Sequence, residues 1–363
     1  MQINQRELRY SDRDLGGTKK EIIGVILLNL GGPDSLRAVR PFLYNLFSDR
    51  KIIRLGPPFL QKPIAWLISS LRSRKTEKIY SLIGGRSPIL DITTEQAKAL
   101  EAALNSSLSS QSPLPPFAKG GRGGIKVYVG MRYWHPFMEE VVPEISRNGV
   151  KKLVALSMYP HYSHATAGSS ISKLKEVLSG YPIVLFCISS WHDHPLYIEA
   201  LIDVIKKGLN SFTSSESGGR EREGRGDIKV LFSAHNLPES IVKKGDPYVN
   251  QIEETIGEIL KRLNIEWYLS YQSKSGPVKW LEPTTEEMLK RFAELGYKKI
   301  LLVPISFVSD HIETLYEIDI LYKGMAERLG MMFKRVDSLN THPLFIEALK
   351  DMVLKGLKEK GWI

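Results

Sequence analysis

Continuous apolar runs recur along the chain, and stretches with the periodicity of amphipathic helices separate them. The first run, Ile22–Leu30, reads IIGVILLNL, a pattern typical of a strand buried on both faces of a parallel sheet. Similar runs lie at Ile125–Gly130, Lys152–Met158, Ile183–Ile188, Lys229–Ser233 and Lys299–Ile305. Helices are predicted at Thr94–Leu104, Pro136–Asn148, Ser169–Leu178, His194–Leu209, Asp246–Leu263 and Thr284–Leu295. This alternation predicts an α/β fold with two doubly wound halves, each built on a parallel sheet.

The predicted halves divide near Ser189–His194, where a strand ends in polar residues. We expect a polar N-terminal tail at 1–20 that lacks the apolar core of a signal peptide, and a first half at 21–189. The second half is expected at 190–335, followed by a C-terminal helix within 336–363 that packs back on the first half. Two Ser- and Gly-rich segments without apolar periodicity, 106–124 and 211–226, are expected to be flexible insertions.

Charge and cysteine content narrow the classes of partner. The chain of 363 residues has a net charge of +10, which suits nucleic acid, an anionic membrane surface or an acidic small molecule. Its single GGRGG stretch is too little for an RNA-binding element, so nucleic acid is not expected. A single cysteine, Cys187, excludes a disulfide framework within the chain and suits a reducing compartment. The apolar run PIAWLISSL at 63–71 is far shorter than the ~20 residues that span a bilayer.

Residues 49–75 combine positive charge with many large apolar residues. The segment carries seven basic residues and one acid, interleaved with Trp66 and many aliphatic side chains. This composition is typical of an element that touches a membrane interface, and a core helix with solvated basic ends is the alternative. Pro57, Pro58 and Pro63 are expected to break the segment into short pieces, which favours the interfacial interpretation.

Two motifs follow predicted strands, and only the second suggests a ligand site. Gly31-Gly32-Pro33-Asp34 either cradles a phosphate or forms a tight turn, and because it lacks a nucleotide-binding fingerprint, no nucleotide is expected. His235 immediately follows a buried strand, where ligands bind in such folds. Its imidazole is either a proton acceptor or metal ligand, or a histidine hydrogen-bonded within a turn.

A third motif, VPISFVSDHIETLYEID at 303–319, ends a strand and opens a helix. Ser309 or Asp310 is a natural N-cap, and Glu313 and Glu317 fall on one helical face, either as a solvated acidic first turn or as functional carboxylates. If Glu313 faces His235, the pair can remove protons and escort a cation.

Other strand ends carry aromatic and histidine residues. Arg132-Tyr133 and Tyr159 suit a flat anionic ligand, through stacking and carboxylate pairing, or pack at the sheet edge. His161 and His164 are spaced to share a metal, although no third ligand lies nearby in the sequence.

At these residues the sequence resembles the ferrochelatase family, from about residue 24 to residue 348. The resemblance is carried by LNLGGPDS (28–35), YSLIGGRSPI (80–89), VGMRYWHP (129–136), MYPHYSHATAGSS (158–170), FSAHNLP (232–238), YQSKSGPVKWLEP (271–283) and PISFVSDHIETLYEID (304–319). It implies two Rossmann-like halves with a porphyrin in the cleft between them. It also implies that His235 accepts pyrrole protons or binds the incoming Fe²⁺, and that Glu313 lies opposite it across the macrocycle.

The resemblance further implies the residues around the substrate. The porphyrin contacts are expected at Leu30, Tyr80, Ser87, Arg132, Tyr133, Tyr159, Ser273, Phe307 and His311. Glu317 is expected to relay the metal, although the relatives' next acid is replaced here by Leu321. Residues 55–75 resemble the family's hydrophobic lip, which implies a cytoplasmic protein held peripherally on an anionic membrane surface. Some relatives hold a [2Fe–2S] cluster through several cysteines, so the lone Cys187 predicts no cluster.

The implied reaction is insertion of Fe²⁺, the metal substrate, into protoporphyrin IX, with release of two protons. Leu30 stands where relatives that process coproporphyrin often have tyrosine, which favours protoporphyrin. A coproporphyrin III ferrochelatase or a cobalt-type chelatase is the alternative enzyme. A carrier of tetrapyrrole or metal is the alternative outside enzymes, and the retained pair of His235 and Glu313 speaks against it.

Overall fold

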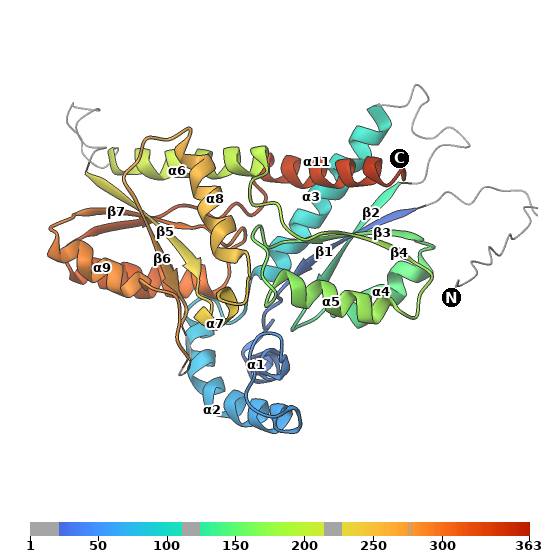
Figure 1. The fold of residues 1–363 in the computed structure, drawn as a ribbon, viewed down its shortest axis with the longest axis horizontal. Coiled ribbons are helices and arrows are strands. Elements are labelled where there is room, and N and C mark those ends of the chain that lie inside the picture. Colours follow the sequence, from blue (N-terminus) through green and yellow to red (C-terminus); the bar gives the residue numbers. More distant parts are fainter. Residues whose placement is uncertain (1–21, 111–123, 214–226, 275, 277) are drawn as a thin grey trace, which may run out of the picture.

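Two parallel four-stranded sheets form the frame of the molecule (Figure 1). The structure is a computed structural model that describes residues 22–110, 124–213 and 227–363, apart from 275 and 277. The first sheet has the order β2-β1-β3-β4 and comprises β1 (Ile23–Asn29), β2 (Ile125–Met131), β3 (Lys152–Ser157) and β4 (Val184–Ile188). The second has the order β6-β5-β7-β8 and comprises β5 (Ile228–His235), β6 (Trp267–Gln272), β7 (Lys299–Pro304) and β8 (Met332–Arg335).

Helices cover both faces of each sheet, because the central strands are apolar on both sides. Every residue of β1 is buried, with Ile26 facing α4 and α5 and Leu27 facing α3 and α11. The helices are α1 (Val39–Ser48), α2 (Gln61–Ser81), α3 (Ile89–Ser110), α4 (Met138–Arg147), α5 (Ala167–Leu178), α6 (Pro195–Thr213), α7 (Glu239–Val242), α8 (Tyr248–Leu260), α9 (Thr285–Glu294), α10 (Lys323–Arg328) and α11 (Pro343–Glu359). Short 3₁₀ turns η1 (Leu36–Ala38) and η2 (Pro58–Leu60) and a π-helix η3 (Glu313–Tyr322) complete the described elements.

The predicted α/β class with two doubly wound halves is therefore confirmed, and the structure adds β6 and β8. The expectation of flexible insertions is wrong for residues 106–110 and 211–213, because α3 continues to Ser110 and α6 to Thr213. In α3, Asn105 accepts the N–H of Ile125 through Oδ1 at 2.9 Å, which ties this part of the helix to β2. Residues 111–123 and 214–226, and the tail at 1–20, lie outside the described residues.

Helices α6 and α11 begin with nearly the same sequence and exchange places between the halves (Figure 1). His194–Leu201 reads HPLYIEAL and His342–Leu349 reads HPLFIEAL. Helix α6 follows the first sheet but lies on the second, where a Cβ on Gly208 would stand 2.8 Å from Leu301 of β7. Helix α11 follows the second sheet but lies on the first, with α3, β3 and β4 as neighbours. Each sheet is thus covered by a helix that follows the other sheet in the chain.

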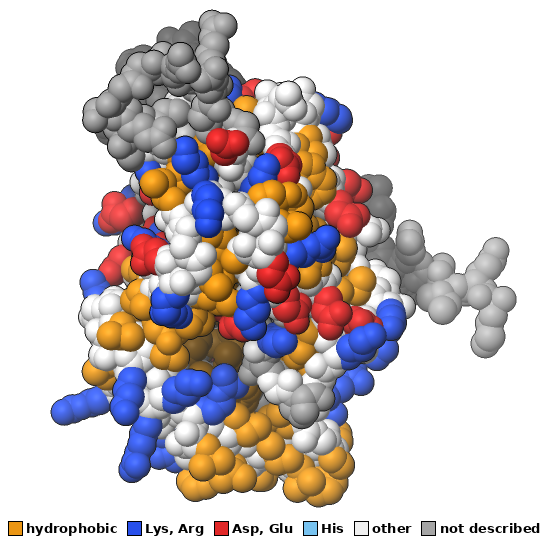
Figure 2. All heavy atoms as spheres, turned by 90° about the vertical axis from the view of Figure 1, so that its left-hand side faces the viewer, with side chains coloured by type: hydrophobic (Ala, Val, Ile, Leu, Met, Phe, Trp, Pro, Cys, Tyr) orange, Lys and Arg blue, Asp and Glu red, His pale blue; other side chains and the backbone are white. Residues whose placement is uncertain are grey.

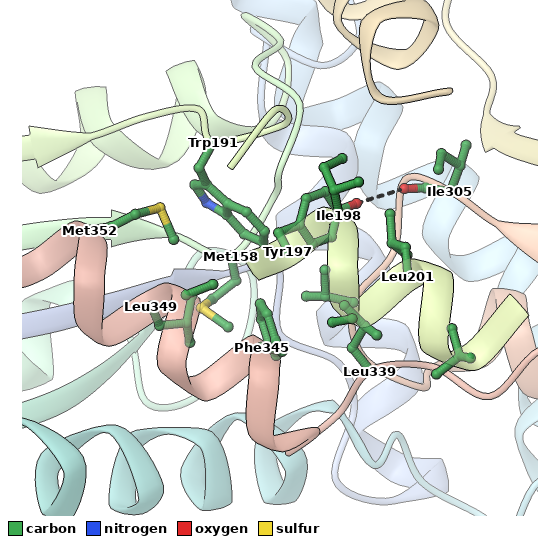
Figure 3. Close-up of a cluster of buried hydrophobic side chains, with 14 of the residues drawn as sticks. Met158, Trp191, Tyr197, Ile198, Leu201, Ile305, Leu339, Phe345, Leu349 and Met352 are labelled. Carbon is green, nitrogen blue, oxygen red and sulfur yellow. Dashed lines mark hydrogen bonds between the residues drawn. The ribbon is translucent and has the colours of Figure 1, made fainter. Parts of the chain in front are cut away.

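A shared apolar core joins these two helices (Figure 3). Tyr197 of α6 is fully buried and donates a hydrogen bond to the Ile305 carbonyl at 3.4 Å, while Trp191 packs against Tyr197 and against Phe345 of α11. Two reciprocal pairs flank the core, His194 with Asp351 at 2.9 Å and His342 with Asp203 at 2.8 Å.

Helices α1 and α2 form a hairpin at one end of the molecule (Figure 1). The expectation that prolines break residues 49–75 into short pieces is wrong from Gln61 onward, because α2 runs unbroken from Gln61 to Ser81. Pro57 and Pro58 precede the helix, and Pro63 lies in its first turn, where a proline costs no intrahelical hydrogen bond.

Candidate active site

A cavity opens where the carboxyl ends of strands from both sheets meet. The first half contributes residues that follow β1 and β3, including Leu30 and Tyr159. The second half contributes His235 at the end of β5, the segment after β7, and Glu313 at the start of η3. The edge of the sheets is the usual place for a ligand in such folds.

His235 and Glu313 form the central pair of the cavity. Nδ1 of His235 lies 2.8 Å from Oε2 of Glu313. The backbone of His235 is fixed on both sides, because its N–H donates to Ser306 Oγ at 2.9 Å and its carbonyl accepts from Tyr248 OH at 3.0 Å. A hydrogen bond from Nδ1–H to the carboxylate leaves the Nε2 lone pair free, as in histidines that bind metals.

The charges of this pair shift both of their pKa values. Burial by itself lowers the pKa of His235, but the adjacent Glu313 carboxylate outweighs burial and raises the pKa above its ordinary value. Burial likewise opposes ionisation of Glu313, yet His235 holds the pKa of that carboxyl well below its usual range. His235 is therefore a stronger base than an isolated buried imidazole. The ionised Glu313 carboxylate stabilises the positive charge that His235 gains when it accepts a proton.

Glu317 joins the pair through Ser273, which follows β6. Ser273 Oγ lies 2.8 Å from Glu313 Oε2 and also contacts Glu317 Oε2. A hydroxyl has one proton, so it cannot donate to two ionised carboxylates at once. Burial and then the charge of Glu313 raise the pKa of Glu317, which favours Glu317 as the group that carries a proton and donates it to Ser273. The side chains of Glu313, Ser273 and Glu317 therefore connect His235 to the middle of η3.

Two expectations about this region are wrong. Glu313 does not lie across a macrocycle from His235, because both follow strands of the same sheet and their side chains are in direct contact. Ser309 and Asp310 do not cap the helix, which begins at Glu313 without a side-chain cap. Ser309 Oγ accepts from Gln96 of α3 at 2.9 Å instead, and Asp310 pairs with Arg335 at 3.1 Å.

Four predicted porphyrin contacts line the cavity: Leu30, Tyr159, Phe307 and His311. The Phe307 ring lies 6.1 Å from the ring of His235 and 4.3 Å from that of His311, between centroids. Nδ1 of His311 bonds to the Ser309 carbonyl at 3.0 Å, and burial lowers the pKa of His311, so the ring is neutral with Nε2 as its acceptor.

Arg132 and Tyr133 are engaged elsewhere and do not line this cavity. Both donate to Oδ2 of Asp49 at 2.7 Å, and Ser169 Oγ donates to the same oxygen at 2.7 Å. Asp49 begins the loop between α1 and α2, so these side chains hold the hairpin against the first half. Arg132 thus pairs with a carboxylate of the protein itself, where the sequence analysis predicted pairing with a carboxylate of the ligand.

Tyr80 and Ser87 are buried and do not line the cavity. Tyr80 packs with Tyr133 and Leu30 in the apolar cluster of the hairpin, and burial raises its pKa, with the charge of Glu313 adding to the effect. The backbone N–H of Ser87 donates to the Pro33 carbonyl at 2.8 Å. A Cβ on Gly32 would lie 2.5 Å from Ser87 Cβ, so Gly31-Gly32 serves a tight turn and a close approach of chains.

His161 and His164 do not share a site. His161 is buried in the cavity wall with Nε2 3.0 Å from Thr255 Oγ1, and burial lowers its pKa to about 3. His164 is exposed and contacts Tyr162 OH at 3.2 Å. Among the described residues, no group of three or more His, Cys, Asp or Glu is placed to hold a metal ion. Sequence reasoning missed Tyr248, which lies in no distinctive motif, and Ser306, which lies in the 304–319 motif but carried no signal that separated it from its neighbours.

Comparison with known proteins agrees with these features. Residues 22–357 match the ferrochelatase family. The chain is 47% identical to "Ferrochelatase" of Geotalea daltonii, covering 94% of this chain and 99% of the relative, and 47% identical to "Ferrochelatase" of Gloeothece citriformis, covering 94% and 84%. The solved structure of SirB from Bacillus subtilis with Fe³⁺ matches with 8% identity and a TM-score of 0.49, covering 93% of this chain and 97% of that one. These matches define a metal chelatase, and the chain belongs to the ferrochelatase family.

Proposed function

We propose that this chain is a lyase that inserts Fe²⁺ into protoporphyrin IX in the last step of heme synthesis. The observation that carries the proposal is the contact between His235 and Glu313 at the wall of a cavity shared by both halves. Insertion forms bonds from iron to the ring nitrogens and releases two pyrrole protons. A neutral imidazole with a carboxylate behind it accepts such protons, and hydrogen bonds through Ser273 connect this base to a second carboxyl group, Glu317.

Delivery of iron needs weak and few ligands, because the metal has to leave for the porphyrin. His235 offers Nε2, which suits a borderline cation such as Fe²⁺. The described residues hold no closed set of three such ligands, and this suits transfer better than storage. A carrier that only binds the porphyrin or the metal has no need for the base pair and its proton chain.

The test is anaerobic insertion of Fe²⁺ followed by absorbance, with protoporphyrin IX and coproporphyrin III as competing substrates. Turnover with preference for protoporphyrin is the expected result. Preferred turnover of coproporphyrin would overturn the substrate assignment, and binding without insertion of Fe²⁺, Zn²⁺ or Co²⁺ would indicate a carrier.

Leu30 is the residue we propose for substrate selection. It lines the cavity beside the apolar cluster of the hairpin, where it favours the porphyrin with fewer carboxylates. Leu30→Tyr should lower the ratio of protoporphyrin to coproporphyrin turnover, while Leu30→Met, which keeps an apolar side chain, should preserve it. An equal ratio in both variants would refute selection by this residue.

We also propose that residues 55–75 attach the protein peripherally to an anionic membrane surface. Helix α2 buries its small residues Ala65, Ser69 and Ser73 and exposes large apolar ones, Trp66 (56% exposed) and Leu71 (73%). Phe59, in the turn η2 before the helix, is 76% exposed. Figure 2 shows apolar side chains gathered at one end of the molecule, with lysine and arginine beside them. None of the described helices is long and apolar enough to cross a membrane.

Flotation with anionic and neutral liposomes tests this attachment. Trp66→Ser with Leu67→Ser should weaken binding to anionic vesicles, while Val184→Ser, an exposed residue of β4 outside this segment, should not. Unchanged flotation of the double variant would contradict the proposal.

Three further assignments complete the proposed function. The enzyme works without an iron–sulfur cluster, because one cysteine cannot supply the usual cysteine ligands. It works in the cytoplasm, which the lone, half-buried Cys187 favours. Its working units are 21–189 and 190–335, joined by the C-terminal segment 336–363, and the position of α11 on α3, β3 and β4 supports this division.

A further inference from the structure

Arg335, the last residue of β8, binds two carboxylates of the segment that carries Glu313 and Glu317. Its Nε and Nη2 donate to Oδ1 and Oδ2 of Asp319 at 2.8 Å each, a bidentate pair. Its Nη1 lies 3.1 Å from Oδ1 of Asp310. One guanidinium therefore fixes the chain three residues before Glu313 and two residues after Glu317.

The surroundings of Arg335 hold this arrangement in one geometry. The Arg335 side chain is 11% exposed and that of Asp310 is 19% exposed. Asp310 also accepts from Ser338 Oγ at 2.8 Å and from Asn340 Nδ2 at 2.9 Å. The carbonyl of Asn340 in turn accepts from Gln96 of α3 at 2.8 Å, which connects the arrangement to the first half.

The π-helix η3 needs such a fixed point. Wide π-turns are rare and usually last a single turn, whereas η3 spans ten residues and begins without a side-chain cap. Ile318 and Tyr322 pack on the second sheet, but apolar packing is not directional and does not set the position along the helix axis. A bidentate arginine pair is directional, because its two parallel hydrogen bonds fix both distance and plane.

We propose that Arg335 is a positioning residue for metal insertion: by holding Asp310 and Asp319 it sets the register of η3 and so places Glu313 against His235 and Glu317 against Ser273. The inference rests on the proposed function, since it concerns the same site. Arg335 itself touches neither the cavity nor the described pair, and it acts only through η3.

The expected effect follows from the geometry. A displacement of about 1 Å at reacting groups can cost about 10²-fold in rate. Arg335→Lys keeps the positive charge but loses the fork, and Asp319→Asn keeps the shape but loses the charge. Both should slow the insertion step about 10- to 100-fold and leave the porphyrin dissociation constant within a few-fold, because Leu30, Tyr159 and Phe307 keep their places.

Single-turnover insertion with enzyme in excess over porphyrin separates positioning from folding. The amplitude reports the fraction of folded, active enzyme, and the rate constant reports the geometry of the site. Arg262→Lys, which alters a surface pair with Glu199 between α8 and α6, is the matched control and should behave as wild type. Hydrogen exchange of amides 313–322 provides a readout independent of activity, and it should accelerate in Arg335→Lys and Asp319→Asn alone.

The outcomes are distinct. A slower rate constant with normal amplitude, together with faster exchange in 313–322, supports the positioning role. A reduced amplitude with the wild-type rate constant, or unchanged kinetics, overturns it and leaves Arg335 a merely structural residue. If the wild type inserts no metal, the proposed function fails, and unchanged amide exchange in Arg335→Lys would then refute the control of η3 separately.

Discussion

Replacing Glu313 by glutamine separates the two effects of this carboxylate on His235. The glutamine amide can still accept from Nδ1–H, so the hydrogen bond at 2.8 Å is retained in form while the negative charge is lost. Loss of a carboxylate behind a metal-binding histidine typically costs about 10- to 100-fold in activity. We expect a loss of this size at the optimum pH, because the imidazole becomes a weaker base and less charge is available to stabilise the accepted proton.

The dependence on pH should move in a defined direction. Glu313 raises the pKa of His235 against the opposing effect of burial. Without that charge, burial dominates and the pKa falls, so His235 stays neutral to lower pH than in the wild type. The acid limb of the pH–rate profile should therefore shift to lower pH even though the maximal rate decreases.

The assay is anaerobic Fe²⁺ insertion across the acid and neutral range, with kcat/KM for porphyrin measured at each pH. A maximal rate equal to that of the wild type would show that the carboxylate does not support the base. A reduced rate whose acid limb stays in place, or moves to higher pH, would show that the limb does not report His235.

Three further changes test the packing that holds the site. Phe345→Ala empties a fully buried position between α6 and α11 and should cost about 3–5 kcal/mol of unfolding free energy in urea titrations. Asp49→Asn should lower the unfolding free energy by about 3 kcal/mol, because it removes the charge that pairs with Arg132. Burial raises the pKa of Asp49, but its hydrogen bonds lower the pKa by more. The stability that the ionised Asp49 contributes is therefore present at neutral pH and is lost as the pH falls through its folded-state pKa. The stability of Asp49→Asn should accordingly change less in acid than that of the wild type. Gly32→Ala should force Ser87 away and cost about 1–3 kcal/mol, measured the same way.

The central strands were predictable because apolar residues continue through them on both faces. β1 and β3 are almost wholly buried, and the sequence shows this directly. Strands β6 and β8 were missed because polar or charged residues such as Ser270 and Lys334 interrupt their apolar residues over short lengths. Helix α2 was missed because its large apolar residues point outward, the reverse of the pattern that identifies a helix in a soluble protein.

The members of the site were predictable in type but not in arrangement. His235 and Glu313 were assigned from their motifs, yet their direct contact depends on the pairing of β5 with β7, which no local pattern encodes. The partner of Arg132 was unpredictable for the same reason, because Asp49 lies far from it in the sequence and reaches it through the fold of the hairpin. Sequence spacing identifies candidates, and long-range packing decides which of them meet.

The most direct test of the account is anaerobic Fe²⁺ insertion into protoporphyrin IX by wild type and His235→Ala, with porphyrin affinity measured in parallel. The account predicts a loss of about 10²–10⁴-fold or more in insertion rate, with porphyrin binding preserved, because the variant lacks the base and Nε2 but keeps the cavity. Full insertion activity in His235→Ala would contradict the central claim.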